Sequence, residues 1–175
     1  MKARAAALDY FAGNLRRAYF LLRYTGQRGS DVVRFGETFI DDGGFRLTQK
    51  KNGKKTGEIW CPIEAELAAE MATWERRPGP YLQQAHGKRY SRKFLDNHFA
   101  AARAQILQLD GVTLHCLRAT RGVELRQRGS TELQIQDQVG MSLKMIGRYC
   151  RFADKKANGK AAVVALAERR KNSGM

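Results

Sequence analysis

Apolar residues recur at three- and four-residue steps along most of this chain, which restricts it to a largely helical fold. The first such run predicts an amphipathic helix over residues 4–24, with Gly26 as its C-terminal stop. Ser30 is positioned to cap a second, short helix that ends at Phe35. Hydrophobic residues make up 43% of the sequence, enough for one buried core, so we expect a single globular domain.

Strand-like patterns occur in one part of the chain. Residues 38–41, 45–49 and 58–61 are short runs of alternating character. An Asp-Gly-Gly turn at 42–44 and a stretch rich in Lys, Asn and Gly at 50–57 separate them. This arrangement predicts a small antiparallel meander.

Helical patterns return after Pro62 and continue to the end of the chain. The fold class we expect is α+β, mainly α-helical with a small three-stranded antiparallel sheet. The next helix is expected to follow Pro62 and to run to about residue 77, where Pro-Gly-Pro at 78–80 ends it. Further helices are expected over residues 91–107, in three segments between 112 and about 151 (divided at 128–130 and 140–142), and in an Ala-rich stretch near 160–170.

The charge balance points to a polyanionic partner. There are 32 Lys and Arg against 17 Asp and Glu, a formal net charge of +15. The surplus is concentrated in residues 43–60 and 141–175, whereas residues 61–80 are net acidic. Such segregation favours an electrostatic footprint for nucleic acid over evenly solvated charge.

Several other classes are excluded by what the sequence lacks. No apolar run reaches the roughly 20 residues that a membrane span needs, and no leader pattern precedes the first helix, so we expect a cytoplasmic protein without a membrane partner. Three cysteines without C-x-x-C spacing suggest neither a disulfide framework nor a zinc site. No phosphate-binding loop or pair of metal-binding acids is evident, and Asp41-Asp42 reads as a turn. Any chemistry on nucleic acid is therefore expected to use side-chain cations, without metal, ATP or another cofactor.

Four marks stand in order along the chain. They are Thr25-Gly26-Gln27-Arg28, a basic hairpin beginning at Gln49-Lys50-Lys51, His115-Cys116-Leu117-Arg118, and a late Tyr149. With the small sheet between them, the sequence resembles the catalytic domain of the tyrosine recombinase (phage integrase) family over about residues 10–154. That resemblance implies a site-specific recombinase that cleaves and rejoins DNA through a 3′-phosphotyrosine intermediate.

The resemblance assigns five catalytic positions. Arg28 and Arg118 match the two catalytic arginines, His115 the histidine of the H-x-x-R box, and Tyr149 the nucleophile. Lys51 matches the hairpin lysine, with Lys55 as the second choice, because hairpin register is not readable to one residue.

Elementary chemistry gives these residue types suitable roles. Attack on a phosphodiester builds negative charge, which two guanidiniums can clamp through paired hydrogen bonds. A tyrosine needs nearby cations and a proton acceptor to attack near neutral pH, and His115 can take that proton. Lys51 can protonate the departing deoxyribose oxygen.

Two departures from the family pattern bear on activity. Met141 stands where a histidine or tryptophan is usual and cannot donate a hydrogen bond to phosphate. Only some twenty residues precede the T-G-x-R turn. We therefore expect a catalytic domain over residues 1–154 and a basic, Ala-rich tail helix over 155–175, without the N-terminal domain that grips the other side of the DNA.

Alternative interpretations remain open. Residues 135–149 also read as a helix-turn-helix around Gly140, which would make the protein a non-catalytic DNA-binding module; an inactive integrase remnant and a basic RNA-binding domain are further possibilities. The expected partners are double-stranded DNA, which would bring the protein to the nucleoid, and other protomers in a tetrameric synapse, with no small-molecule substrate. The side chains expected to hold DNA outside the catalytic set are Lys50, Lys54, Lys55, Lys144, Arg148 and Arg151.

Overall fold

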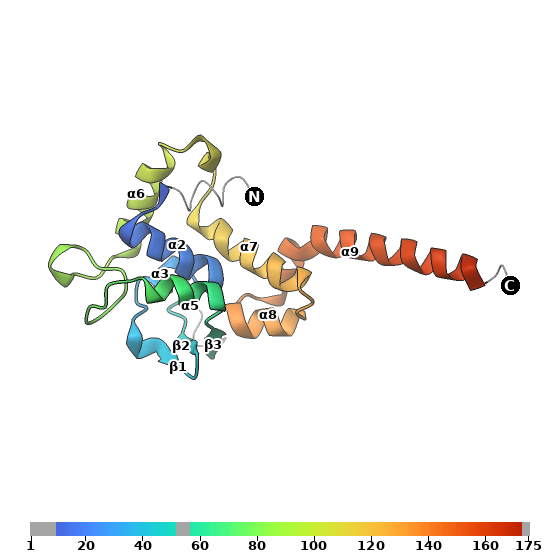
Figure 1. Cartoon of the computed structure of the whole chain (residues 1–175), viewed down its shortest axis with the longest axis horizontal. Coiled ribbons are helices and arrows are strands. Elements are labelled where there is room, and N and C mark those ends of the chain that lie inside the picture. Colours follow the sequence, from blue (N-terminus) through green and yellow to red (C-terminus); the bar gives the residue numbers. More distant parts are fainter. Residues whose placement is uncertain (1–9, 52–56, 173–175) are drawn as a thin grey trace.

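A computed structural model describes residues 10–51 and 57–172, with the side chains of the last helix described to residue 169. Helices α2, α3, α5, α6, α7 and α8 and a three-stranded sheet form a rounded body, and helix α9 runs out from it (Figure 1). The mainly helical α+β fold class is confirmed. The bounds are α2 Gly13–Thr25, α3 Gly29–Val32, β1 Ile40–Asp41, β2 Gly44–Thr48, β3 Glu58–Pro62, α5 Ala65–Ala72, α6 Arg92–Arg103, α7 Leu114–Gln127, α8 Glu132–Val139 and α9 Leu143–Asn172.

The N-terminal helix differs from the expected continuous run. Residues 11 and 12 are not helical, because Ala12 is extended and Gly13 takes a left-handed φ of 50°. Helix α2 therefore begins at Gly13, and the start of the expected run, residues 4–9, lies outside the described residues. Its end is as predicted, since Gly26 is left-handed (φ 63°) and its N–H donates to the Leu22 carbonyl.

Two further helix boundaries correct the sequence expectations. The cap of α3 is Arg28 and not Ser30, so this helix starts two residues earlier than expected and ends at Val32. Helix α5 ends at Ala72 and not near residue 77, because the chain tightens there into a final turn in which Trp74 N–H donates to the Met71 carbonyl.

The predicted meander is confirmed. The strands pair in the order β1-β2-β3, all antiparallel, with Phe45 opposite Cys61 and Leu47 opposite Ile59. These four side chains are buried, so one face of the sheet closes the core beneath α2. Strand β1 is shorter than expected because residues 37–39 form a 3₁₀ turn before it.

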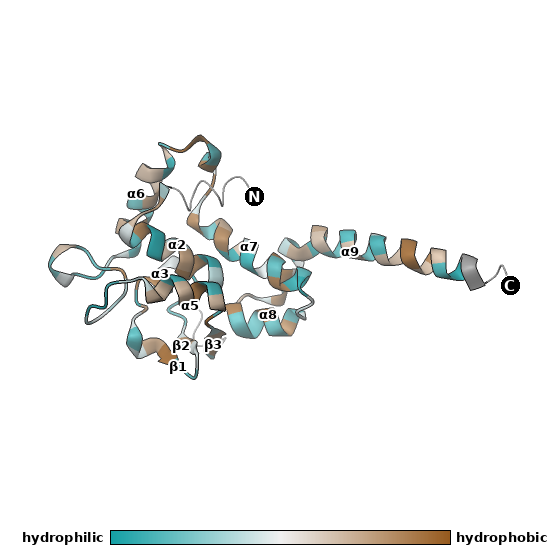
Figure 2. Cartoon of the chain, in the orientation of Figure 1, coloured by the Kyte–Doolittle hydropathy of each residue, from teal (hydrophilic) through white to brown (hydrophobic). Residues whose placement is uncertain are grey.

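The C-terminal helices bury a second apolar cluster. Helices α7, α8 and α9 contribute Leu125, Ile135, Val139, Ile146 and Cys150, all less than 9% exposed. In Figure 2 hydrophilic and hydrophobic residues are mixed along α9, as they are on the helices of the body. The cluster fixes the first turns of α9 against α7 and α8.

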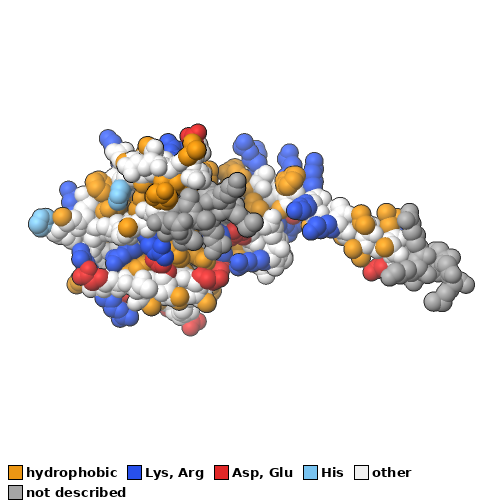
Figure 3. Space-filling view, turned by 45° about the horizontal axis from the view of Figure 1, so that its top comes forward, with side chains coloured by type: hydrophobic (Ala, Val, Ile, Leu, Met, Phe, Trp, Pro, Cys, Tyr) orange, Lys and Arg blue, Asp and Glu red, His pale blue; other side chains and the backbone are white. Residues whose placement is uncertain are grey.

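Helix α9 is continuous over thirty residues, which corrects the expectation of one helix ending near Arg151 and a separate one at 160–170. The intervening sequence contains only Gly159 as a weak breaker, and helix formers surround it. The described side chains from residue 155 onward are exposed. In Figure 3 this part of the helix carries blue cations near the body and hydrophobic side chains further out. No helix among the described residues is long and apolar enough to cross a membrane.

The turn between α8 and α9 yields a first prediction. Gly140 has a left-handed φ of 72°, and a Cβ there would sit 2.5 Å from Gln49 Nε2 and from Ile59 Cδ1. We expect Gly140→Ala to lower the free energy of unfolding by about 2 kcal/mol, combining backbone strain with crowding. Gly111 has a similar φ of 68° with nothing near its Cβ position, so Gly111→Ala should lose only about 1 kcal/mol. Urea denaturation measures both, and equal losses would contradict the crowding.

Candidate active site

The turn between α2 and α3 holds Arg28 in the wall of a cavity. Thr25 ends α2 with its hydroxyl donating to the Leu21 carbonyl at 2.5 Å, and Arg28 then caps α3 in an extended conformation. The guanidinium Nη1 donates to Gln49 Oε1 at 2.5 Å. The arginine is therefore fixed at its base by a helix start and at its tip by the residue that follows β2.

A buried pair of glutamines joins this turn to the rest of the site. Gln49 Nε2 donates to Gln27 Oε1 at 2.6 Å and to the Val139 carbonyl at 2.9 Å. Gln27 Nε2 donates to the Gln138 carbonyl at 3.0 Å. Both glutamines are 2% exposed or less. Buried amides with these bonds satisfied hold the α2–α3 turn, the hairpin and the end of α8 in one geometry.

Arg118 is buried in the site, with 3% of its surface exposed. Its Nη1 donates to the carbonyls of Gly26 and Val139 at 2.7 and 2.8 Å, and its Nη2 donates to the Gly140 carbonyl at 3.0 Å. Burial, and then the neighbouring charge of Arg28, lower the pKa of Arg118 to about 10. The guanidinium therefore remains protonated at neutral pH, and it ties the end of α2 to the turn after α8.

Four of the five predicted catalytic residues line one cavity of about 250 Å³. The described residues around it include four cations and one histidine, and none of them is an Asp or Glu. Such a lining favours an anionic ligand. The complete set of described lining residues is Gln27, Arg28, Gly29, Ser30, Lys51, Arg92, Leu114, His115 and Arg118.

The fifth residue, Tyr149, reaches the cavity through His115. The Tyr149 hydroxyl lies 3.3 Å from His115 Nε2, which brings α9 and the first turn of α7 together. Burial lowers the pKa of His115, and the charges of Arg118, Arg92 and Arg28 lower it further. The imidazole is therefore neutral at pH 7 and can accept a proton from the tyrosine.

Lys51 lines the cavity, and Lys50, next to it in the chain, is exposed. Asp31, fully buried, accepts the N–H of Lys50 at 2.8 Å and a longer bond from Arg34 at 3.5 Å. Asp31 thus anchors the start of the hairpin segment. Lys54 and Lys55, including the alternative hairpin lysine, lie outside the described residues.

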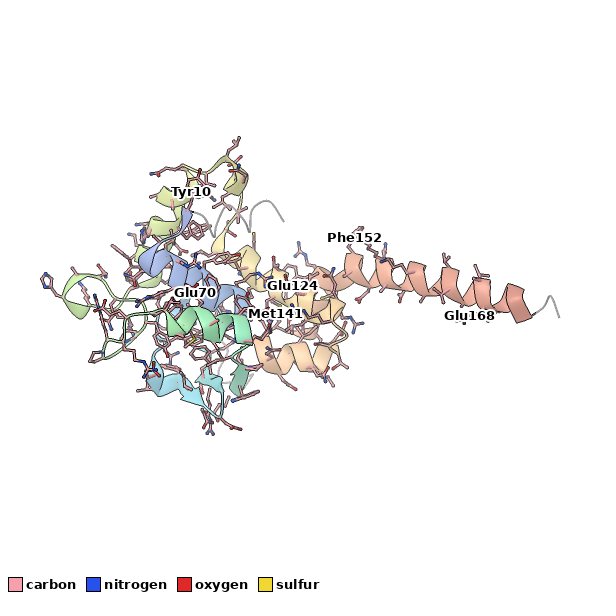
Figure 4. The ribbon with its side chains drawn as sticks, in the orientation of Figure 1. Tyr10, Glu70, Glu124, Met141, Phe152 and Glu168 are labelled. Atoms are coloured by element: carbon pink, nitrogen blue, oxygen red, sulfur yellow. The ribbon has the colours of Figure 1, made fainter. Side chains whose placement is uncertain are left out.

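Met141 packs and does not face the cavity. It is 4% exposed in the C-terminal cluster, with its sulfur 3.7 Å from the position of a Cβ on Gly122 of α7 (Figure 4). By contrast, Lys144, Arg148 and Arg151 on α9 are exposed and available to a partner.

Three residues that contribute to the site were not predicted from the sequence. Gln27 and Gln49 sit inside the quoted motifs, but neutral amides carry no charge signal, and Arg92 lies far from any motif at the start of α6. The sequence signal that could have indicated Arg92 is Ser91, a residue type that caps helices. Its hydroxyl accepts the Phe94 N–H at 3.0 Å, so Arg92 is the first residue of α6.

A larger cavity of about 730 Å³ lies elsewhere, among α2, β1, α5 and the 73–83 segment. Its described lining includes Trp74, Tyr81 and Arg17 but none of the five predicted catalytic residues. Among the described residues there is also no group of three or more His, Cys, Asp or Glu side chains that would hold a metal ion. The smaller cavity is therefore the candidate site.

No protein-family model and no curated protein sequence matches this chain. Solved structures do. A lambda integrase dimer bound to a COC′ core site matches with a TM-score of 0.70 and 18% identity, covering 85% of this chain and 57% of that one. The lambda integrase catalytic core matches with a TM-score of 0.62 and 21% identity over 77% of this chain and 87% of that chain. XerA recombinase matches with a TM-score of 0.63 and 16% identity, covering 85% of this chain and 54% of that one.

These similarities establish the fold. The chain spans 44 to 57% of the length of the first matched structures, but most of the isolated lambda catalytic core. At such identities, shared architecture carries no statement about activity.

Proposed function

We propose that this chain, which has the fold of tyrosine recombinase catalytic domains, cleaves and rejoins DNA strands through a covalent phosphotyrosine. One observation carries the proposal: Arg28, Lys51, His115 and Arg118 surround a single cavity, and the Tyr149 hydroxyl meets His115 at 3.3 Å. A nucleophile, a proton acceptor and several cations are thereby within reach of one phosphate.

The reaction follows from those groups. Tyr149 Oη attacks the phosphorus, its proton passes to His115, and the bond to the 5′ oxygen breaks as Lys51 protonates that oxygen. Arg28 and Arg118 stabilise the charge on the non-bridging oxygens. The product is a 3′-phosphotyrosine and a free 5′ hydroxyl. Attack by a 5′ hydroxyl on this ester reverses the step, so rejoining needs neither ATP nor a metal.

The exposed cations around the site support double-stranded DNA as the substrate. Lys144, Arg148 and Arg151 recur at steps of four and three residues and so share one side of α9, the helix that carries Tyr149. Lys50 adds a charge on the hairpin side. Contacts of this kind bind phosphates without regard to sequence and position the duplex over the cavity.

The wider assembly is part of the same proposal. In this proposal, residues 1–154 are the catalytic unit and residues 155–175 are a tail that contacts another protomer. Four protomers assemble on DNA in a synapse, and the DNA brings them to the nucleoid in the cytoplasm. The exposure of Val163, Val164 and Leu166 at 55 to 67% supports a partner for the tail. One matched structure is a lambda integrase tetramer bound to a Holliday junction.

Covalent trapping tests the function. The chain is incubated with randomised-sequence duplexes carrying scattered nicks, so that cleavage near a nick releases a short strand and prevents rejoining. We expect adducts that survive detergent, and peptide mapping should place the nucleotide on Tyr149. DNA binding without any adduct would contradict the proposed enzymatic activity and favour the non-catalytic helix-turn-helix alternative.

The pH dependence gives another prediction. His115 must be neutral to accept the proton, and its pKa lies below the ordinary 6.5. Adduct formation should therefore stay level near pH 7 and fall only below pH 6.5, about tenfold per unit once His115 is mostly protonated. The His115→Gln variant should form the adduct more slowly, and its rate should not fall in this way at low pH. Single-turnover rates of adduct formation from pH 5 to 8 measure this dependence. The same fall at low pH in His115→Gln would contradict His115 as the proton acceptor.

A further inference from the structure

We infer that Arg92 is an additional phosphate-contacting residue of this site, oriented by Asp96. The inference rests on the proposed function and extends it to a residue outside all of the sequence motifs. Arg92 is the first residue of α6 and lines the same cavity as Arg28 and Arg118.

The geometry directs Arg92 across the start of α3. Its Nε donates to Asp96 Oδ2 at 2.7 Å, one helical turn further along α6. Its Nη1 occupies the space where a Cβ of Gly29 would stand, so the glycine permits this approach. The side chain is thus held at Nε, with its terminal nitrogens beside the residue that follows Arg28.

The terminal nitrogens of Arg92 are available for a ligand. Within the described part of the chain, neither makes a hydrogen bond to another residue. Arg118 differs, because its two terminal nitrogens already donate three bonds to backbone carbonyls. Arg92 can therefore offer N–H groups to a phosphate with less competition from the protein itself.

The electrostatics point the same way. Arg92 is close enough to His115 to lower the pKa of the imidazole, so its charge is felt where the proton transfer is proposed. Arg28, Lys51, Arg92 and Arg118 repel one another around one cavity whose described lining includes no carboxylate, although Asp96 pairs with Arg92 and Asp31 acts on Arg118 from outside that lining. A phosphate with its negative charge is the ligand that relieves this repulsion, and a guanidinium fork matches its two non-bridging oxygens.

The test uses two duplexes of the sequence that the covalent trapping experiment identifies. One has the ordinary phosphodiester at the cleaved position, and the other has a methylphosphonate there. The methylphosphonate is neutral and has one non-bridging oxygen. Single-turnover adduct formation is measured for the native chain, Arg92→Met, Asp96→Asn and the control Lys93→Met. Lys93 is exposed on the same helical turn and does not line the cavity. Thermal unfolding confirms that each variant is folded.

We expect Arg92→Met to be slower on the phosphodiester by on the order of 10²-fold, and by less than about 3-fold on the methylphosphonate. Asp96→Asn should show a smaller loss with the same dependence on the phosphate, and Lys93→Met should resemble the native chain on both. Equal losses for Arg92→Met on the two substrates, or no loss beyond Lys93→Met, would overturn the inference while leaving the function standing. Absence of any adduct with the native chain would overturn the proposed function, and this inference with it.

Discussion

Tyr149→Phe is expected to form no covalent adduct with DNA, a loss of at least about 10³-fold, because phenylalanine has no oxygen to attack phosphorus. The folded state should be nearly unaffected. Tyr149 makes its hydroxyl contact to His115 in an exposed position, and its ring, which packs against the C-terminal cluster, is retained. A neutral, exposed hydrogen bond contributes about 1 kcal/mol or less. Non-covalent DNA binding should change by no more than about twofold in a filter-retention assay, since no charge is removed.

Tyr10→Phe is the matched control. Tyr10 is 66% exposed and lies on the upper part of the body, away from the outer part of α9 (Figure 4). It loses the same hydroxyl and should trap DNA at the native rate. An adduct that persists in Tyr149→Phe would show that another residue is the nucleophile.

Arg118→Met should lower the free energy of unfolding by about 2–4 kcal/mol and abolish adduct formation. The substitution strips the carbonyls of Gly26 and Gly140 of the donors that Arg118 supplies, whereas the Val139 carbonyl keeps its bond from Gln49. Each buried acceptor left without a partner costs about 1–3 kcal/mol. The removal of a buried charge offsets part of that cost.

Urea denaturation gives the stability, and trapping well below the melting temperature gives the activity of the folded fraction. Arg103→Met is the comparison, because Arg103 donates to a single carbonyl, that of Val112, at 2.8 Å. It should lose about 1 kcal/mol and keep the native trapping rate. Native activity in folded Arg118→Met would restrict Arg118 to a structural role.

Much of the fold was readable because it rests on local patterns. The meander follows from three short strand runs, and the end of α2 follows from Gly26, whose left-handed φ suits a residue without a Cβ. The errors lie where distant contacts or weak signals decide. The cap of α3 is Arg28, whose guanidinium is held by Gln49, and α9 continues past Arg151 because a single glycine does not end a helix.

The site divides in the same way. The order of motifs singled out Arg28, Lys51, His115, Arg118 and Tyr149 as candidates, because charged and nucleophilic side chains at set spacings carry a chemical signal. Their roles remain predictions. The same spacing says nothing about Gln27, Gln49 or Arg92. The two glutamines contribute through hydrogen bonds to residues 21 to 111 positions away, and Arg92 contributes by lining the cavity.

The sequence by itself determined the element types, the basic surplus and the candidate residues, since helix and strand periods, turn residues and charge are properties of short segments. Only the tertiary structure decided that the α2–α3 turn, the hairpin and α7 bring four of those residues and Arg92 to one cavity, and that Tyr149 of α9 lies against His115. The physical reason is that buried hydrogen bonds and core packing act between segments far apart in the chain, where no local pattern records them.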